Sequence, residues 1–194
     1  MAEQDNTVRD EIVSFDSEEL ILVDNEDCEI GCLSKAQCHE GNGVLHRAFS
    51  LFVFNRAGEL LLQQRASGKR LWPLYWSNSC CSHPRRGEDM NEAVHRRLWQ
   101  EIGIEATLDY LYKFQYQERF GSRGSEHELC WVYLGFSDEE PRPNRREVAD
   151  WCWVSPTRLD TELSEGEKQF TPWFKMEWKR MRGEFESELK RYIN

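Results

Sequence analysis

The chain has 194 residues, enough for one domain with a hydrophobic core, and no Pro-, Gly- or Ser-rich linker divides it. Its formal net charge of −10 argues against nucleic acid or an anionic membrane as the main partner, because both need clustered Lys and Arg, but it allows a small anionic substrate. The sequence has no apolar run of about 18 residues and no basic-then-apolar leader, so we expect a protein that is neither membrane-spanning nor secreted.

The chain contains seven cysteines, an odd number without any Cys-x-x-Cys pair. This pattern favours reduced thiols in a cytoplasmic protein over a disulfide framework. It also argues against a structural zinc site made of four thiolates.

The first part of the chain is expected to hold an arm followed by strands. Residues 1–19 are polar and aperiodic, which is typical of a loosely ordered segment. A short apolar run at 20–23 predicts a strand, residues 28–31 are expected to return as a second strand after a turn at 24–27, and a short helix is expected to begin at Ser34. Residues 44–54 are rich in aromatic and β-branched side chains, and they predict a longer strand.

A hairpin and a helix are expected next. Residues 55–58 (Asn-Arg-Ala-Gly) are typical of a hairpin loop, so 59–65 is predicted to return as the partner of the preceding strand. An amphipathic helix is predicted to start at residues 87–89 and to end at Gly103. Its apolar positions recur at helical spacing: Ala93, Val94, Leu98 and Ile102.

The C-terminal half combines strands and helices. Five elements are expected there: strands at 104–117, 126–136 and 151–154, and helices at 155–163 and 172–192. Several hairpins with a few intervening helices indicate an α/β (α+β) sandwich rather than a strictly alternating parallel fold.

Residues 78–84 (Asn-Ser-Cys-Cys-Ser-His-Pro) are expected to be extended. Alternate side chains of a strand share a face, so Cys81 and His83 would point into the same space and Cys80 away from it. Buried cysteines are common in cores, so packing is one interpretation of the pair, and a chemical site is the other.

A second pair of candidate ligands lies on a predicted strand. Glu126 and Glu128 flank His127, so the two carboxylates share one face and His127 takes the other. Together with His83 of the extended stretch and the two glutamates, His39 and His46 make a set of ligands that could fill a five- or six-coordinate site for Zn²⁺ or Mn²⁺. Each of these residues alone would also suit a loop or a solvated face.

The predicted helix carries a degenerate form of the Nudix box. The matching positions are Glu88, Arg96, Leu98, Glu101, Gly103 and Ile104. Ser82 replaces the first Gly of the pattern, and Arg97 and Gln100 replace two of its glutamates. Nudix hydrolases use these carboxylates to gather metal ions on a diphosphate. The remaining matches therefore still indicate the fold, whereas the replaced glutamates weaken the interpretation of the chain as a hydrolase.

Together these features resemble the type 1 isopentenyl-diphosphate isomerases. The resemblance covers residues 35–173 and rests on segments in the same order: His39, residues 45–50, residues 78–84, the degenerate Nudix helix, residues 126–128 and residues 170–173. It implies a Nudix-like sandwich of mixed sheet flanked by helices, with an N-terminal arm and first strands at 1–34 and one catalytic domain at 35–194. It also implies a monomeric, cytoplasmic enzyme of isoprenoid biosynthesis that interconverts isopentenyl and dimethylallyl diphosphate, without nucleic acid or membrane partners.

Moving a double bond along a branched C5 chain needs an acid and a base on opposite sides of the substrate, and a tertiary carbocation lies between the two proton transfers. Cys81 and Glu128 are the natural groups for these roles. By resemblance, Tyr116 assists Glu128. Trp173 would stabilise the cation through its ring, although core packing is an equally good interpretation of this residue.

The resemblance further assigns binding roles. The diphosphate would be held by four cations: Lys35, Arg65, Lys69 and Arg97. Mg²⁺ would be held by Glu101 and the backbone carbonyl of Cys81, and Zn²⁺ or Mn²⁺ by the second metal site. That second site would consist of His39, His46, His83, Glu126 and Glu128.

Two other functions stay open from the residues alone. A Nudix diphosphohydrolase is the nearest enzyme alternative, and a zinc-stabilised interaction module is the alternative from another class. The two remaining histidines, His95 and His127, are expected to be structural.

Overall fold

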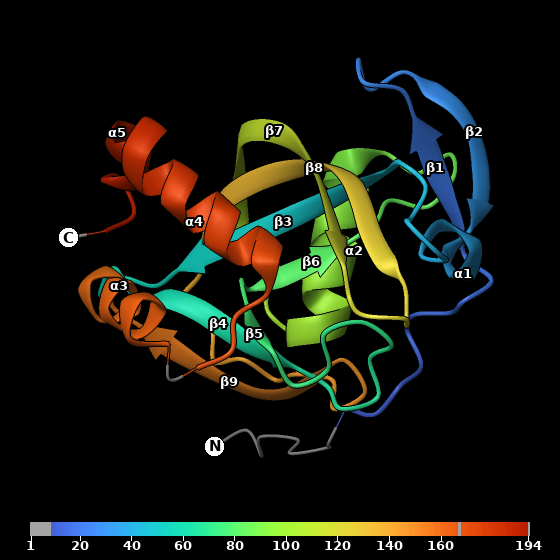
Figure 1. Cartoon of the computed structure of the whole chain (residues 1–194). Helices are drawn as coiled ribbons and strands as arrows, with labels where there is room; N and C mark the ends of the chain where they lie inside the picture. The colour runs from blue at the N-terminus through green and yellow to red at the C-terminus, as the bar shows by residue number, and fades with distance from the viewer. Residues whose placement is uncertain (1–8, 167, 194) are drawn as a thin grey trace.

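The computed structural model describes residues 9–166 and 168–193 (Figure 1). In chain order the elements are β1 (Glu19–Val23), β2 (Glu29–Ser34), α1 (Lys35–Cys38), β3 (His46–Phe54), β4 (Leu60–Arg65), β5 (Trp76–Ser77), β6 (Cys80–Ser82), α2 (Met90–Ile102), β7 (Thr107–Arg119), β8 (Ser125–Phe136), β9 (Val148–Val154), α3 (Pro156–Glu165), α4 (Pro172–Glu184) and α5 (Glu186–Leu189). None of the helices in the described ranges has the length and apolar character needed to cross a bilayer.

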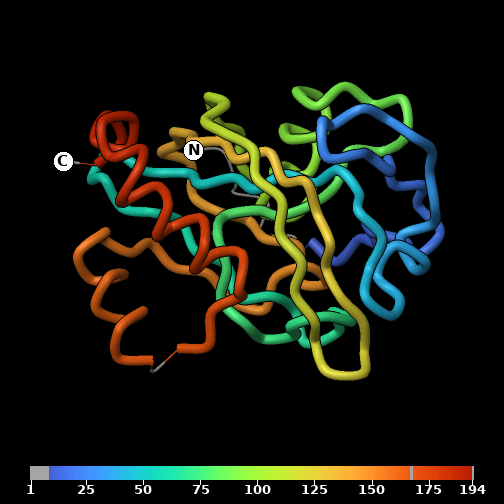
Figure 2. Tube along the Cα trace, turned by 45° about the horizontal axis from the view of Figure 1, so that its top comes forward, coloured from blue at the N-terminus to red at the C-terminus, as the bar shows by residue number. Residues whose placement is uncertain are grey.

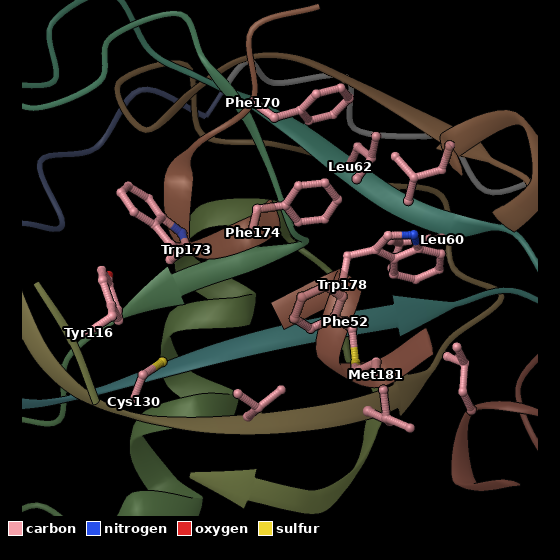
Figure 3. Close-up of a cluster of buried hydrophobic side chains, with 14 of the residues drawn as sticks. Phe52, Leu60, Leu62, Tyr116, Cys130, Phe170, Trp173, Phe174, Trp178 and Met181 are labelled. Atoms are coloured by element: carbon pink, nitrogen blue, oxygen red, sulfur yellow. The ribbon is translucent and has the colours of Figure 1, made fainter. Parts of the chain in front are cut away.

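Strand β3 lies at the centre of the mixed sheet. It runs parallel to β8 along its whole length, and its other edge pairs in turn with β1, β6 and β4. Its side chains alternate between two hydrophobic layers: Phe49, Leu51 and Val53 on the α2 side, and Ala48, Phe52 and Phe54 on the α4 side. The sheet is thus covered by α2 on one face and by α4 on the other (Figures 1 and 3), which confirms the predicted sandwich.

The long β7–β8 hairpin, yellow in Figure 2, confirms the two strands predicted at 104–117 and 126–136. Helix α2 also forms as predicted. Asp89 caps its first turn by accepting a hydrogen bond from the backbone N–H of Asn91, and Gly103 ends it in a left-handed conformation with φ of 73°.

The predicted β3–β4 hairpin is confirmed at its turn, where β4 returns antiparallel to β3, but the two strands pair only at the turn. Only Phe54 and Leu60 pair across it, while β4 pairs along its length with β9. The strands diverge because Ser79 lies between them: its hydroxyl donates to the Leu61 carbonyl and accepts from the Val53 N–H, both at 2.8 Å. This insertion brings β6, which carries Cys81, against β3.

The C-terminal helix is shorter than the predicted span of 172–192. Helix α4 ends at Glu184, and Phe185 leaves the helical region with φ of −122° and ψ of 31° before the single turn of α5. The ring of Phe185 stacks on Tyr112 with centroids 4.7 Å apart, so packing against β7 accompanies the break.

Residues 9–18 have no regular secondary structure, but they are packed against the domain rather than loose. Val13 is buried, its carbonyl accepts a hydrogen bond from Arg97 at 2.6 Å, and Ser14 accepts one from Lys35 at 2.5 Å. Residues 1–8 of the predicted arm lie outside the described residues. Strands β1 and β2, which we grouped with the arm, belong to the same sheet as β3.

Candidate active site

A cavity of about 380 Å³ opens between the arm, the basic loop that follows β4, and strands β6, β7 and β8. Of the residues predicted for the site, these line it: Lys35, His39, Arg65, Lys69, Cys81, His83, Arg97, Tyr116, Glu126, Glu128 and Trp173. The other two predicted residues are buried beside these side chains, His46 in the histidine cluster and Glu101 against Arg97. Residues from five strands and three helices thus meet at one cavity.

The thiol of Cys81 is enclosed by polar groups. It donates to Asn78 Oδ1 at 2.7 Å and accepts from Trp173 Nε1 at 3.1 Å, and the Ser77 hydroxyl lies 3.6 Å away. Burial raises the pKa of the thiol to about 12. Cys81 is therefore protonated at neutral pH and is equipped to act as a proton donor.

Glu128 faces the same cavity from the other side of β3. Cys81 pairs with Ser50 on one edge of β3, and Glu128 pairs with His46 on the opposite edge. The hydroxyl of Tyr116, which is opposite Glu128 in the β7–β8 register, donates to its Oε2 at 2.6 Å. A thiol and a carboxyl group therefore reach one cavity from different strands.

Five side chains form a cluster in which one ligand atom from each lies within 4.8 Å of all the others. Glu126 and Glu128 share one face of β8 as predicted. His39 Nε2 lies 2.7 Å from Glu126, and His83 Nε2 lies 2.9 Å from Glu128. His46 completes the cluster from the start of β3.

The tautomers of two histidines are fixed by backbone carbonyls. His39 Nδ1 donates to the Lys35 carbonyl at 2.6 Å, and His46 Nδ1 donates to the Val44 carbonyl at 2.7 Å, so each Nε2 lone pair faces the cluster. The buried His46 Nε2 has no hydrogen-bond partner among the described residues. A buried, unpartnered imidazole nitrogen beside two carboxylates fits a divalent cation.

The charges of the cluster also suit a cation. Burial lowers the pKa of His46 to about 3 and that of His83 well below its ordinary value, so both rings are neutral and could serve as ligands of a cation. Burial and the neighbouring Glu126 raise the pKa of Glu128. Although burial acts to raise the pKa of Glu126, the adjacent His39 lowers it to about 2.

The cationic end of the cavity holds the four predicted diphosphate ligands. Arg97 donates to Glu101 at 2.5 Å, and Arg65 donates to the Leu71 carbonyl at 2.9 Å while its guanidinium lies 5.3 Å from the centre of the Trp173 ring. Burial, reinforced by the neighbouring positive charges, lowers the pKa of Lys35 to about 8.

Glu147 is a cavity residue that the sequence did not reveal. It forms an ion pair with Lys69 and lies 3.6 Å from Arg97. It follows the charged 141–146 loop, where nothing in the local pattern distinguishes it from solvated acids. The two histidines expected to be structural do not line the cavity: His127 contacts Gln115, and His95 contacts Asn91.

Comparisons with known proteins agree with this arrangement. The NUDIX domain model matches residues 44–174. The chain is 44% identical over 163 residues to isopentenyl-diphosphate Delta-isomerase 1 of Photorhabdus laumondii, covering 83% of this chain and 93% of that protein. It is 42% identical over 159 residues to isopentenyl-diphosphate Delta-isomerase of Saccharopolyspora erythraea, covering 80% and 81%.

Among solved structures, the protein DR0079 of Deinococcus radiodurans aligns with a TM-score of 0.65 at 22% identity, over 91% of this chain and 100% of that chain. The MutT protein of Methanosarcina mazei aligns with a TM-score of 0.57 at 20% identity, over 74% and 94%. At these identities the structural likeness concerns the fold alone.

Proposed function

The chain belongs to the NUDIX family and, within it, to the isopentenyl-diphosphate Delta-isomerases, and we propose that Cys81 and Glu128 are the two groups with which it interconverts isopentenyl and dimethylallyl diphosphate. The observation that carries the proposal is their placement on opposite sides of β3, facing one cavity. A neutral thiol and a carboxylate on different strands are suited to adding a proton on one side of a substrate and removing one on the other.

The reaction shifts a double bond by one position. One group gives its proton to the terminal carbon of the alkene, which forms a C–H bond and leaves a tertiary carbocation. The other group then removes a proton from the neighbouring methylene on the far side of the cationic carbon, and the C–H electrons form the new double bond. Cys81 enters this cycle as a protonated thiol, and the Tyr116 hydroxyl fixes the carboxylate of Glu128.

The carbocation needs an electron-rich aromatic ring beside it rather than a nearby free anion. The ring of Trp173 adjoins the cavity, and its centroid lies 6.1 Å from that of Tyr116. A cation–π contact with a desolvated aromatic ring contributes about 2 kcal/mol. We assign this contact to Trp173.

The diphosphate is assigned to the cationic end of the cavity: Lys35, Arg65, Lys69 and Arg97. Arg97 stands where Nudix hydrolases have a glutamate, and a guanidinium there pairs with phosphate oxygens instead of holding a hydrolytic metal ion. Glu101 is a buried carboxylate beside Arg97, and it would hold Mg²⁺ together with the backbone carbonyl of Cys81. When bound, Mg²⁺ would offset the negative charge of the diphosphate.

The histidine cluster is assigned to Zn²⁺ or Mn²⁺, with His39, His46, His83, Glu126 and Glu128 as ligands. When bound, this cation would bias the proton affinity of Glu128. The protein is proposed to act as a cytoplasmic monomer on a small-molecule diphosphate. Its net charge of −10 supports the proposal that neither nucleic acid nor a membrane is its partner.

The test is proton NMR of isopentenyl diphosphate in D₂O with purified protein, Mg²⁺ and added Zn²⁺ or Mn²⁺. We expect dimethylallyl diphosphate to appear with deuterium incorporated, and we expect Cys81→Ala to fold but to abolish the conversion. Release of phosphate from an otherwise unchanged C5 chain would instead favour the diphosphohydrolase. A folded, metal-loaded protein that leaves the substrate untouched would favour the zinc-stabilised interaction module.

A further inference from the structure

Glu177 is a buried carboxyl group to which the reaction described above gives no role. It lies on α4, one helical turn after Trp173, and it is fully inaccessible to solvent. No Lys or Arg forms an ion pair with it in the described part of the chain. Its helix neighbours belong to the large hydrophobic cluster shown in Figure 3: Trp173, Phe174, Trp178 and Met181.

The side chain of Glu177 connects to the active-site thiol through two polar groups. Cys130, which Figure 3 shows on the same side of the cluster as Trp173, donates from Sγ to Glu177 Oε1 at 3.6 Å and approaches Ser50 Oγ at 3.4 Å. The Ser50 hydroxyl in turn donates to the Cys81 Sγ at 3.9 Å. A chain of polar contacts therefore runs from α4 through β8 and β3 to the thiol on β6.

Burial favours the protonated form of this carboxyl group at neutral pH. Burial raises the pKa of Glu177 to about 8, even though hydrogen bonding from Ser50 and Cys130 lowers it. A neutral carboxylic acid can both donate and accept a hydrogen bond, as a glutamine side chain can. Its other carboxyl oxygen, Oε2, is buried without a hydrogen-bond partner among the described residues, so burying the group carries a desolvation penalty that an apolar side chain of the same length would avoid.

We propose that Glu177 is a positioning residue for the isomerisation: through the contacts that lead from it by way of Cys130 and Ser50, it orients the Cys81 thiol toward the substrate. This inference rests on the proposed function, because Cys81 matters only if it transfers a proton. The side chain is kept at the expense of folding stability, which is expected of a group that serves the site rather than the core.

Three matched variants of the metal-loaded enzyme test the proposal. Glu177→Gln keeps the shape and the hydrogen bonds, and we expect kcat within about twofold of wild type. Glu177→Met keeps the length and removes the polar atoms; we expect kcat to fall about tenfold and KM to stay unchanged, since one orienting hydrogen bond is lost. The melting temperature of Glu177→Met should equal or exceed that of wild type.

Met181→Leu, on the same helix and in the same cluster but without polar contacts to Cys81, is the control for repacking and should leave kcat unchanged. Ser50→Ala tests the same chain of contacts at its other end. If both residues act through this chain, the double variant Ser50→Ala with Glu177→Met should have a kcat no lower than that of the weaker single variant. If Glu177→Met does not fold, an unchanged kcat in Ser50→Ala would still overturn the proposal.

The inference fails if Glu177→Met keeps the wild-type kcat, or if both Gln and Met lower stability and activity together. Conversion of isopentenyl diphosphate by the wild-type enzyme in the same assay separates these results from a failure of the proposed function. A wild-type protein without isomerase activity would overturn both.

Discussion

Trp173 Nε1 donates a hydrogen bond to the Cys81 Sγ at 3.1 Å, so the first turn of α4 holds the thiol carried by β6. The same indole adjoins the space where the carbocation is proposed to form. Under the proposed function, one residue would therefore both hold the proton donor and stabilise the cation that proton transfer creates.

Trp173→Phe should lower kcat at least tenfold, because it removes the hydrogen bond to Cys81 and leaves a ring with a weaker cation–π interaction. Steady-state conversion of isopentenyl diphosphate measures the effect. Trp178→Phe is the matched control: its indole lies on the same helix and donates to Asp160 at 2.7 Å, away from the cavity. It should change stability by about 1 kcal/mol and leave kcat unaltered.

Tyr116→Phe should lower kcat about tenfold or more with little change in KM, since the hydroxyl that bonds to Glu128 at 2.6 Å is lost while the ring stays. Tyr110→Phe alters an exposed tyrosine of the same strand and should have no effect on kcat. Equal losses in the two variants would contradict the role given to Tyr116.

The apparent affinity for the diphosphate should weaken as pH rises through about 8. Burial lowers the pKa of Lys35 to that value, so the side chain is an ammonium that pairs with phosphate below pH 8 and a neutral amine above it. KM for isopentenyl diphosphate, measured from pH 6.5 to 9.5, should therefore rise on the alkaline side. Lys35→Arg keeps its charge over this range, and a profile as steep as that of wild type would contradict the assignment.

Removal of metal ions should destabilise the protein. A ligand present at 100 times its dissociation constant stabilises the folded state by about 2.7 kcal/mol, so a chelator should lower the melting temperature. His46→Gln should bind less Zn²⁺ or Mn²⁺ by elemental analysis and respond weakly to the chelator. His127→Gln, on the opposite face of β8 from the cluster, should retain the wild-type metal content and response.

Gly103→Ala should lower the free energy of unfolding by about 3 kcal/mol, because a Cβ at this position would lie 2.5 Å from the Arg142 carbonyl oxygen in a backbone conformation with φ of 73°. Gly121 also has a positive φ, of 57°, but nothing lies within 4 Å of a Cβ there. Gly121→Ala should therefore lower the free energy of unfolding by only about 1 kcal/mol, and urea denaturation separates the two contributions.

Patterns in neighbouring residues predicted the helices and strands that are determined by their own sequence. The apolar spacing of α2, together with Asp89 before it and Gly103 after it, indicates both the helix and its two ends. The alternation of residues along β8 indicates that Glu126 and Glu128 share one face. The family resemblance then allowed the side chains that line the cavity to be named. The motifs that carry the resemblance are residue types at fixed spacings, so they can be recognised in the sequence before the fold is known.

What the sequence could not provide depends on contacts between distant segments. The Asn-Arg-Ala-Gly turn forms a hairpin as the sequence indicates, but beyond its first residue pair the Ser79 hydroxyl, which comes from a later segment, bonds to both β3 and β4 in place of their direct pairing. Glu147 and Glu177 look like ordinary surface acids along the chain. Only the tertiary structure shows that Glu147 pairs with Lys69 in the cavity and that Glu177 connects to the Cys81 thiol through Cys130 and Ser50.

The cations of the cavity all have partners before any substrate arrives. Arg97 donates to Glu101 and to the Val13 carbonyl of the N-terminal segment, Lys69 pairs with Glu147, and Lys35 donates to Ser14. If these cations bind the diphosphate as proposed, its entry would be an exchange reaction, in which phosphate oxygens compete with the protein's own carbonyl, hydroxyl and carboxylate oxygens for the same donors. The affinity for the diphosphate would then reflect the difference between two hydrogen-bonded states, so we expect it to be weaker than four unpaired cations around one diphosphate would give.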